Sequence, residues 1–173
     1  MSVTRLTLLL ADPRRIDYSF NESRISQTAE YVWHAECSPK EAEKITAIFG
    51  DLCIPGFTTP GEHTVKSFTE KGFFLASGES CTGGLIGAEI TSVPGSSRMF
   101  WGAMVTYENS AKKNVLGVRE ETLAAEGAVS SGTVLEMAAG LQQLSGAQVC
   151  VTVSGIAGPG GGTDDKPVGT VWF

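Results

Sequence analysis

From residue 73 onward, short apolar runs alternate with segments in which apolar residues recur every three or four positions. The runs at 73–77, 100–107, 148–154 and 168–173 have the length and apolar content of buried strands. The clearest helical spacing is that of Val134, Met137, Ala138, Leu141 and Leu144. This spacing places five apolar residues on one face of a helix, which we expect to pack against a sheet.

Turn residues divide the same region into elements of ordinary length. Pro94-Gly95 ends a helix predicted at 85–93. A second helix is predicted at 109–116, with Asn109 as its N-cap and Gly117 at its end. Strands and helices that alternate at this spacing are typical of an α/β layered domain.

The first seventy residues show a different pattern. A short strand is predicted at 6–10, a helix at 40–49 that begins after Ser38-Pro39, and a short helix at 62–70. No apolar period is sustained over residues 1–50, so we expect this part to be more loosely ordered than the rest. The sequence therefore divides into a segment 1–71 of no recognised class and a domain at 72–173.

Composition and charge exclude several classes of function. The formal net charge is -6, which is opposite in sign to the basic surface of a nucleic-acid-binding protein. The four cysteines form no CxxC pair, and the two histidines lie far apart, so we expect no metal site. No apolar run is long enough to span a membrane, and we expect a cytoplasmic protein with reduced thiols.

Three loops contain residue types that could do chemistry, and the first follows the strand predicted at 73–77. In Glu79-Ser80-Cys81-Thr82-Gly83-Gly84, a serine lies between a strand end and a helix start. The N–H groups of a helix start can stabilise an oxyanion, and paired glycines let a substrate approach the backbone. The alternative is structural, because serine, threonine and glycine are common at any helix start.

The second loop, at 105–113, offers a base for that serine. The sequence pattern places neither histidine where it could act as the base, but a lysine can act as the base if burial lowers its pKa. Lys112 is the candidate, with the Tyr107 hydroxyl as a nearby group that could orient it or relay a proton. The alternative is that Lys112 and Lys113 are ordinary solvated lysines. Residues 110–113 also match S-x-x-K, but no Ser-Asp-Asn or Lys-Thr-Gly follows.

The third loop, at 154–162, begins at Ser154 and contains five glycines. Its backbone N–H groups could bind an anion, although a glycine-rich turn without a ligand fits the sequence as well. It lacks the Gly-Lys-Ser/Thr ending of a P-loop, which excludes ATP binding through that motif.

Seven ordered blocks in this half resemble the CinA C-terminal domain family. They are Glu-Ser-Cys-Thr-Gly-Gly, Pro-Gly-Ser-Ser, Val-Thr-Tyr-x-Asn-x-Ala-Lys, Leu-Gly-Val, Gly-Ala-Val-Ser, Ser-Gly-Ile-Ala-Gly-Pro and Lys-Pro-Val-Gly-Thr-Val-Trp-Phe. The resemblance implies a three-layer α/β/α sandwich, a homodimer, and a metal-free amidohydrolase that needs no cofactor. Its implied reaction converts nicotinamide mononucleotide (NMN) to nicotinic acid mononucleotide and ammonia.

The resemblance also implies roles for individual residues. Ser80 matches the nucleophile, Lys112 the general base and Tyr107 the assisting hydroxyl. The residues expected to contact substrate are Ser154, Gly155, Thr82, Gly83 and Gly84. Two other functions stay open, namely a catalytically impaired binding or interaction module and a serine amidase for another small amide.

The end of the sequence departs from the family pattern. Family domains continue with another strand, an arginine that contributes to the site, and a long helix, whereas this sequence ends at Phe173. We therefore expect a truncated and impaired domain, with Trp172 and Phe173 partly exposed or covered by other material. The strand at 6–10 and a partner chain are the two candidates for that cover.

Overall fold

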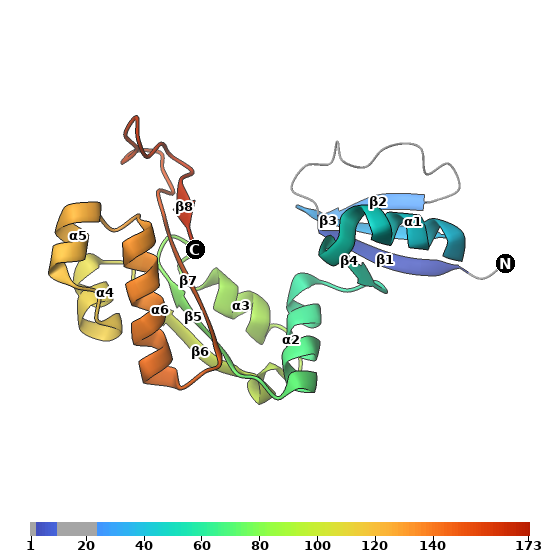
Figure 1. The fold of residues 1–173 in the computed structure, drawn as a ribbon, viewed down its shortest axis with the longest axis horizontal. Helices are drawn as coiled ribbons and strands as arrows, with labels where there is room; N and C mark the ends of the chain where they lie inside the picture. The colour runs from blue at the N-terminus through green and yellow to red at the C-terminus, as the bar shows by residue number, and fades with distance from the viewer. Residues whose placement is uncertain (1–2, 10–23) are drawn as a thin grey trace. The chain divides into compact units, whose positions relative to one another are not determined.

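The computed structural model describes residues 3–9 and 24–173, which form two compact units, Met1–His63 and Thr64–Phe173. Each unit has its own four-stranded sheet (Figure 1). The boundary between the units falls within helix α2, Pro60–Lys71. Among the described residues, no helix is both long and apolar enough to cross a membrane.

The N-terminal unit is an antiparallel sheet with strand order β2-β3-β1-β4. Its strands are β1 (Thr4–Leu9), β2 (Arg24–Ala29), β3 (Val32–Cys37) and β4 (Cys53–Pro55). Helix α1, Pro39–Phe49, begins at a capping box formed by Ser38 and Glu41, and the short helix η2, Gly50–Leu52, follows it. A buried cluster that includes Leu8 and Ile45 joins α1 to the sheet.

This packed core bears on two expectations. In the described part of residues 1–50, the full burial of Leu8, Ala35 and Ile45 counts against the expected loose order. The strand expected at 6–10 does not cover the edge of the C-terminal sheet, because β1 pairs with β3 and β4. Leu10 lies outside the described residues.

The C-terminal unit is the expected α/β layered domain. Its sheet has the order β6-β5-β7-β8, with β5 (Leu75–Glu79) parallel to both β6 (Phe100–Val105) and β7 (Val149–Gly155). The short β8, Val171–Trp172, runs antiparallel to β7. The four predicted strands are therefore present, although the last is reduced to two paired residues.

Helices cover both faces of this sheet, as the three-layer sandwich requires. The chain moves from β5 to β6 on one side through α3 (Leu85–Thr91) and the short helix η3 (Ser96–Arg98), and it returns to β7 on the other side. Right-handed crossovers in opposite directions place their helices on opposite faces. Figure 1 shows α2 and α3 on one face, and α6 with α4 on the other.

The return connection consists of α4 (Asn109–Leu116), α5 (Glu120–Glu126) and α6 (Ser131–Ser145). The expected helix over Val134–Leu144 is confirmed by α6. Helix α4 ends at Leu116 as predicted, but its N-cap is Glu108 rather than Asn109, because the Glu108 side chain accepts from Ser110 N. Helix α5 was not predicted. Met137 and Leu141 of α6 pack with Leu116 of α4 in one buried cluster, and Ile90 of α3 belongs to a second one. Two separate apolar layers thus hold the sheet between its helices.

Candidate active site

The three parallel strands end at the same edge of the sheet, and each is followed by one of the loops singled out in the sequence. Ser80 follows β5, Lys112 lies on α4 beyond β6, and Ser154 stands near the end of β7. Open α/β sheets bind ligands at the carboxyl ends of their strands. The topology therefore brings side chains from three distant segments to one place.

The nucleophile candidate is held between β5 and α3. The backbone N–H of Ser80 donates to Val153 O at 3.0 Å, which continues the pairing of β5 with β7 by one residue. The Ser80 side chain is buried. Its position is therefore set by the sheet.

The neighbouring Glu79, which sequence reasoning did not assign a role, organises the loop around this serine. Its carboxylate is fully buried and accepts five hydrogen bonds. The donors are Ser77 Oγ at 3.1 Å, Thr82 Oγ1 at 2.7 Å, and the N–H groups of Gly84, Ile86 and Gly87 at 3.0, 3.1 and 2.9 Å. Burial opposes the charge of Glu79, but the hydrogen bonds outweigh it and lower the pKa of the carboxyl.

Glu79 also corrects one expectation about chemistry. The start of α3 was expected to offer its N–H groups to an oxyanion. Because the N–H groups of Gly84, Ile86 and Gly87 donate to Glu79, they are already occupied. The start of α3 therefore binds the Glu79 carboxylate, and an oxyanion must be bound by other donors.

Lys112 is the base candidate, and its amine reaches the serine directly. Lys112 Nζ lies 3.0 Å from Ser80 Oγ, 2.9 Å from Thr106 O and 3.0 Å from Tyr107 O. Only 1% of Lys112 is exposed. Lys113, the next residue, instead pairs with Glu120 at the surface, at 2.8 Å. The expected register, with Lys112 inward and Lys113 outward, is confirmed.

Burial disfavours the protonated form of this amine. Desolvation lowers the pKa of Lys112, and the negative charge of Glu108 offsets this only in part. A neutral lysine amine has two N–H donors and one lone pair. When Thr106 O and Tyr107 O accept the two donors, the lone pair is directed at the Ser80 hydroxyl. The surroundings of Lys112 therefore favour its amine as a proton acceptor.

A pocket of about 310 Å³ opens beside this pair. Typical small-molecule sites range from about 300 to 1,000 Å³. Ser80, Lys112, Tyr107, Ser154 and Gly155 all line it. Further lining residues are Cys81, Asn109, Ala128, Val129, Ile156, Ala157, Gly158, Gly160 and Gly161. Five of the eight residues predicted for the site thus surround one cavity.

Two of these five residues, Tyr107 and Ser154, make contacts that differ from the roles expected for them. Tyr107 is 70% exposed, and it contacts Lys112 through its backbone carbonyl rather than its hydroxyl. Ser154 is buried, and its Oγ donates to Ala128 O at 2.7 Å. Ser154 therefore supports the part of the pocket wall formed by Ala128, while the exposed Tyr107 side chain stands at the rim.

The other three expected contact residues lie away from the pocket lining. Thr82 and Gly84 are bound to Glu79, and the Gly83 N–H donates to Ser80 O at 3.1 Å. Gly83 and Gly84 have φ values of 61° and 102°, which favour glycine. These residues shape the turn after Ser80, as the structural alternative for this loop proposed.

Sequence reasoning missed the pocket wall formed by Ala128 and Val129, which belong to the connection between α5 and α6. Their side chains carry no reactive group, although they belong to the Gly-Ala-Val-Ser block that resembles the family. Asn109 was interpreted only as a helix cap, although it lines the pocket. No group of three or more histidine, cysteine or acidic side chains among the described residues is arranged to hold a metal ion.

Comparisons with known proteins show similarity to one protein family. A profile of the CinA C-terminal domain matches residues 58–173. The nicotinamide-nucleotide amidohydrolase PncC of Enterobacter agglomerans is 56% identical over 103 residues, which are 60% of this chain and 63% of that protein. A CinA-like protein of Chloroherpeton thalassium is 54% identical over 110 residues, which are 64% of this chain but 26% of the relative.

A solved structure supports the fold independently. The competence/damage inducible protein CihA of Agrobacterium tumefaciens superposes with a TM-score of 0.63 at 48% identity. The match covers 64% of this chain and 67% of that one. The present chain thus spans about a quarter of the CinA-like relative and under two thirds of the amidohydrolase.

Proposed function

Because the chain belongs to the CinA C-terminal domain family, we propose that it hydrolyses the carboxamide of nicotinamide mononucleotide to nicotinic acid mononucleotide and ammonia. The observation that carries the proposal is the buried Lys112 amine, 3.0 Å from Ser80 Oγ, at the wall of a pocket. The similarity to a nicotinamide-nucleotide amidohydrolase supports the substrate.

In the proposed mechanism, Ser80 is the nucleophile and Lys112 the general base. Ser80 Oγ attacks the carboxamide carbon while its proton passes to the neutral Lys112 amine. Lys112 then gives this proton to the nitrogen of the tetrahedral intermediate, the C–N bond breaks, and ammonia leaves an acyl-Ser80. A water molecule, deprotonated by Lys112, attacks the acyl carbon, and the proton returns to Ser80 as the acid product is released.

The negative oxygen of the intermediate needs donors. Within the described residues, the Cys81 N–H has no hydrogen-bond partner, and Cys81 lines the pocket beside the nucleophile. The amide that follows a nucleophilic serine is a frequent oxyanion donor. We assign this role to Cys81 N–H. We further propose that the Tyr107 hydroxyl, at the rim of the pocket, contacts the bound substrate.

The test is ammonia release from NMN by the full chain and by two pairs of matched variants. Ser80→Ala and Lys112→Met should each lower the rate by at least about a thousandfold. Ser92→Ala and Lys113→Met make the same changes at exposed positions and should retain the wild-type rate. Equal rates in all variants would show that neither Ser80 nor Lys112 takes part in the reaction.

A substrate panel and a binding measurement separate this proposal from its alternatives. Release of ammonia from another small amide, but not from NMN, would indicate a serine amidase of different specificity. Calorimetric binding of NMN without turnover by the wild-type chain would indicate a binding module. Sedimentation of the same samples tests the homodimer, which we keep as part of the proposal.

A further inference from the structure

Lys166 connects two segments that both line the candidate pocket. It lies in the long loop between β7 and β8, and its Nζ donates to Glu126 O at 2.6 Å and to Val129 O at 2.8 Å. Both carbonyls belong to the turn between α5 and α6, residues 126–130. Lys166 itself does not line the pocket.

Each connected segment contributes part of the pocket wall. The β7–β8 loop contributes the glycine-rich stretch 156–161, and the α5–α6 turn contributes Ala128 and Val129. A change in the distance between the two segments would therefore change the width of the pocket. The Ser80–Lys112 pair stands on other elements, β5 and α4, and would be little affected.

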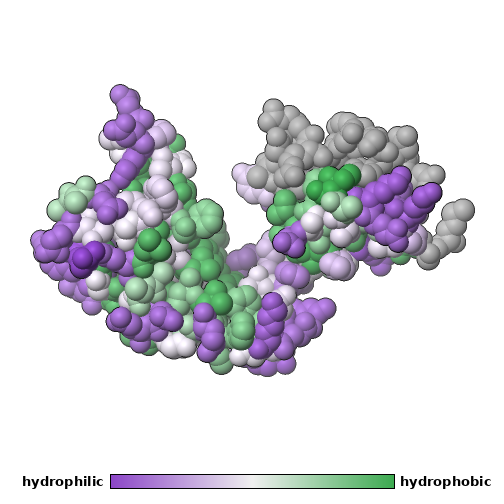
Figure 2. All heavy atoms as spheres, in the orientation of Figure 1, coloured by the Kyte–Doolittle hydropathy of each residue, from purple (hydrophilic) through white to green (hydrophobic). Residues whose placement is uncertain are grey.

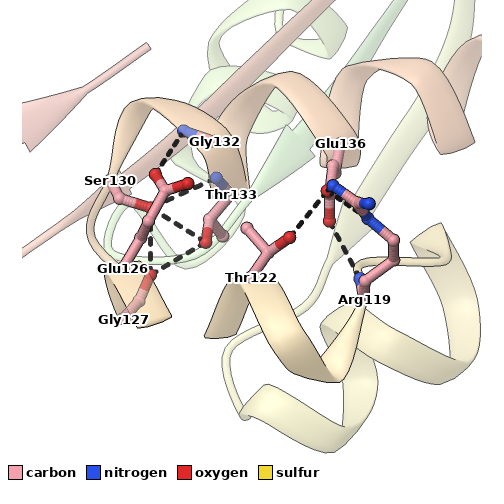
Figure 3. Close-up of polar contacts among 8 residues, drawn as sticks. All are labelled: Arg119, Thr122, Glu126, Gly127, Ser130, Gly132, Thr133 and Glu136. Atoms are coloured by element: carbon pink, nitrogen blue, oxygen red, sulfur yellow. Dashed lines mark hydrogen bonds and ion pairs between the residues drawn. The ribbon is translucent and has the colours of Figure 1, made fainter. Parts of the chain in front are cut away.

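The α5–α6 turn is held in place by hydrogen bonds of its own, which Figure 3 shows. Gly127 O accepts from Ser130 Oγ at 3.0 Å and from Thr133 Oγ1 at 2.8 Å. The Glu126 carboxylate accepts from Gly132 N at 3.2 Å. Ser130 also caps α6 through Thr133 N. These bonds hold the turn independently of Lys166.

The β7–β8 loop has few other attachments. Its backbone hydrogen bonds stay within the loop, from Ile156 N to Thr170 O, Thr163 N to Lys166 O, Gly169 N to Ile156 O and Thr170 N to Pro167 O. Between residues 157 and 168, the bonds from Lys166 Nζ are the hydrogen bonds that reach another segment of the described chain. Figure 2 shows the loop as a hydrophilic projection, which offers little apolar surface to hold it in place.

We propose that Lys166 is a positioning residue, which holds the glycine-rich loop against the α5–α6 turn and thereby sets the width of the substrate pocket. An ammonium group that donates to carbonyls at the end of a helix is favourably placed, because that end carries partial negative charge. The inference rests on the proposed function for its effect on substrate. Its structural part can be tested without any activity.

The kinetic test uses Lys166→Met, which keeps the length but removes the donors, and Lys166→Arg, which keeps charge and donors. Lys166→Met should raise KM for NMN about tenfold, as expected for loss of hydrogen bonds to a charged group. Its kcat should stay within about threefold, because the Ser80–Lys112 pair is untouched. Lys166→Arg and the surface control Lys113→Met should stay near wild type. An unchanged KM in Lys166→Met would overturn the role in binding.

Hydrogen–deuterium exchange of the unliganded full-length variants tests the structural part. In Lys166→Met, amides of residues 156–166 should exchange faster, while those of the α5–α6 turn, β5 and the middle of α6 keep wild-type rates. Unchanged exchange everywhere would overturn the proposal. Faster exchange throughout the C-terminal unit would also overturn it, since Lys166 would then support the whole fold. These outcomes remain decisive if the wild-type chain releases no ammonia, a result that would contradict only the proposed function.

Discussion

Lys112 Nζ and Ser80 Oγ lie 3.0 Å apart although 32 positions separate the two residues in the sequence. The contact depends on two elements that are fixed separately. Ser80 is held by the pairing of β5 with β7, and Lys112 by α4, which begins at its N-cap Glu108 and ends at Gly117. Thr106 O and Tyr107 O then fix the direction of the amine. Both partners are therefore pre-organised before any substrate binds.

The first prediction concerns the pH dependence of catalysis. Desolvation lowers the pKa of Lys112, and only the neutral amine can accept the Ser80 proton. The value of kcat/KM for ammonia release should therefore rise with pH and level off above the lowered pKa of Lys112. A rate profile from pH 5 to pH 10 would measure this.

Lys112→Arg serves as the control for that profile. A guanidinium stays charged throughout this range, so this variant should show no rising limb and almost no activity. If kcat/KM of the wild-type chain falls as pH rises, the assignment of Lys112 as the base is wrong.

The second prediction concerns Glu79. Glu79→Gln replaces a carboxylate that accepts five hydrogen bonds with an amide whose NH₂ group would face N–H donors. Leaving buried donors unsatisfied should lower the free energy of unfolding by about 2–4 kcal/mol at pH 7. Urea unfolding would measure the loss. The same change at the exposed Glu89, on α3, should leave the free energy of unfolding almost unchanged.

The effect of Glu79→Gln should depend on pH in a defined direction. The pKa of Glu79 is lowered in the folded chain, so between that value and about 4.3 the unfolded chain binds more protons. The stability that Glu79 supplies is thus complete above about pH 4.3 and declines as pH falls through its folded pKa. The difference between wild type and Glu79→Gln should shrink on acidification. A difference that grows instead would mean that the carboxyl is protonated in the folded state.

The sequence predicted those elements in which apolar residues follow the spacing of a helix or the run of a buried strand. The α6 helix has apolar residues at helical spacing, and the apolar runs predicted as strands at 73–77 and 148–154 overlap β5 and β7, so their identification needed no long-range information. The N-terminal sheet was harder to predict because β2 is exposed along nearly its whole length and shows no alternation. Phe73, expected in a strand, is 44% exposed, and β5 begins only at Leu75.

The site was predictable to the extent that its chemistry resides in side chains. Ser80 and Lys112 carry reactive groups and belong to motifs of the family. The structural roles of Glu79 and Lys166, and the contact of Ser154 with Ala128 O, were not predicted, because these side chains bind hydroxyls and backbone groups. A backbone N–H or carbonyl is present at nearly every position, so a contact to it leaves no pattern in the sequence.

The third prediction concerns the close approach of α4 to α6, which holds Lys112 in place. A Cβ atom at Gly140 would lie 1.8 Å from the backbone oxygen of Leu116, the last residue of α4. Because that atom belongs to the backbone, Gly140→Ala must move one helix away from the other. We expect a loss of about 3 kcal/mol in the free energy of unfolding, and a lower rate of ammonia release as Lys112 shifts from Ser80.

Gly132→Ala, in the first turn of α6, is the matched control for this change. A Cβ at Gly132 would meet the Glu126 carboxylate at 2.6 Å, but that group ends a flexible side chain that can rotate aside. Alanine also favours the helix over glycine by about 1 kcal/mol, which offsets part of the cost. Urea unfolding of the two variants should therefore differ by at least about 2 kcal/mol, with Gly140→Ala the less stable. Equal stabilities would mean that α4 can shift without cost, and the rigid placement of Lys112 would then need another explanation.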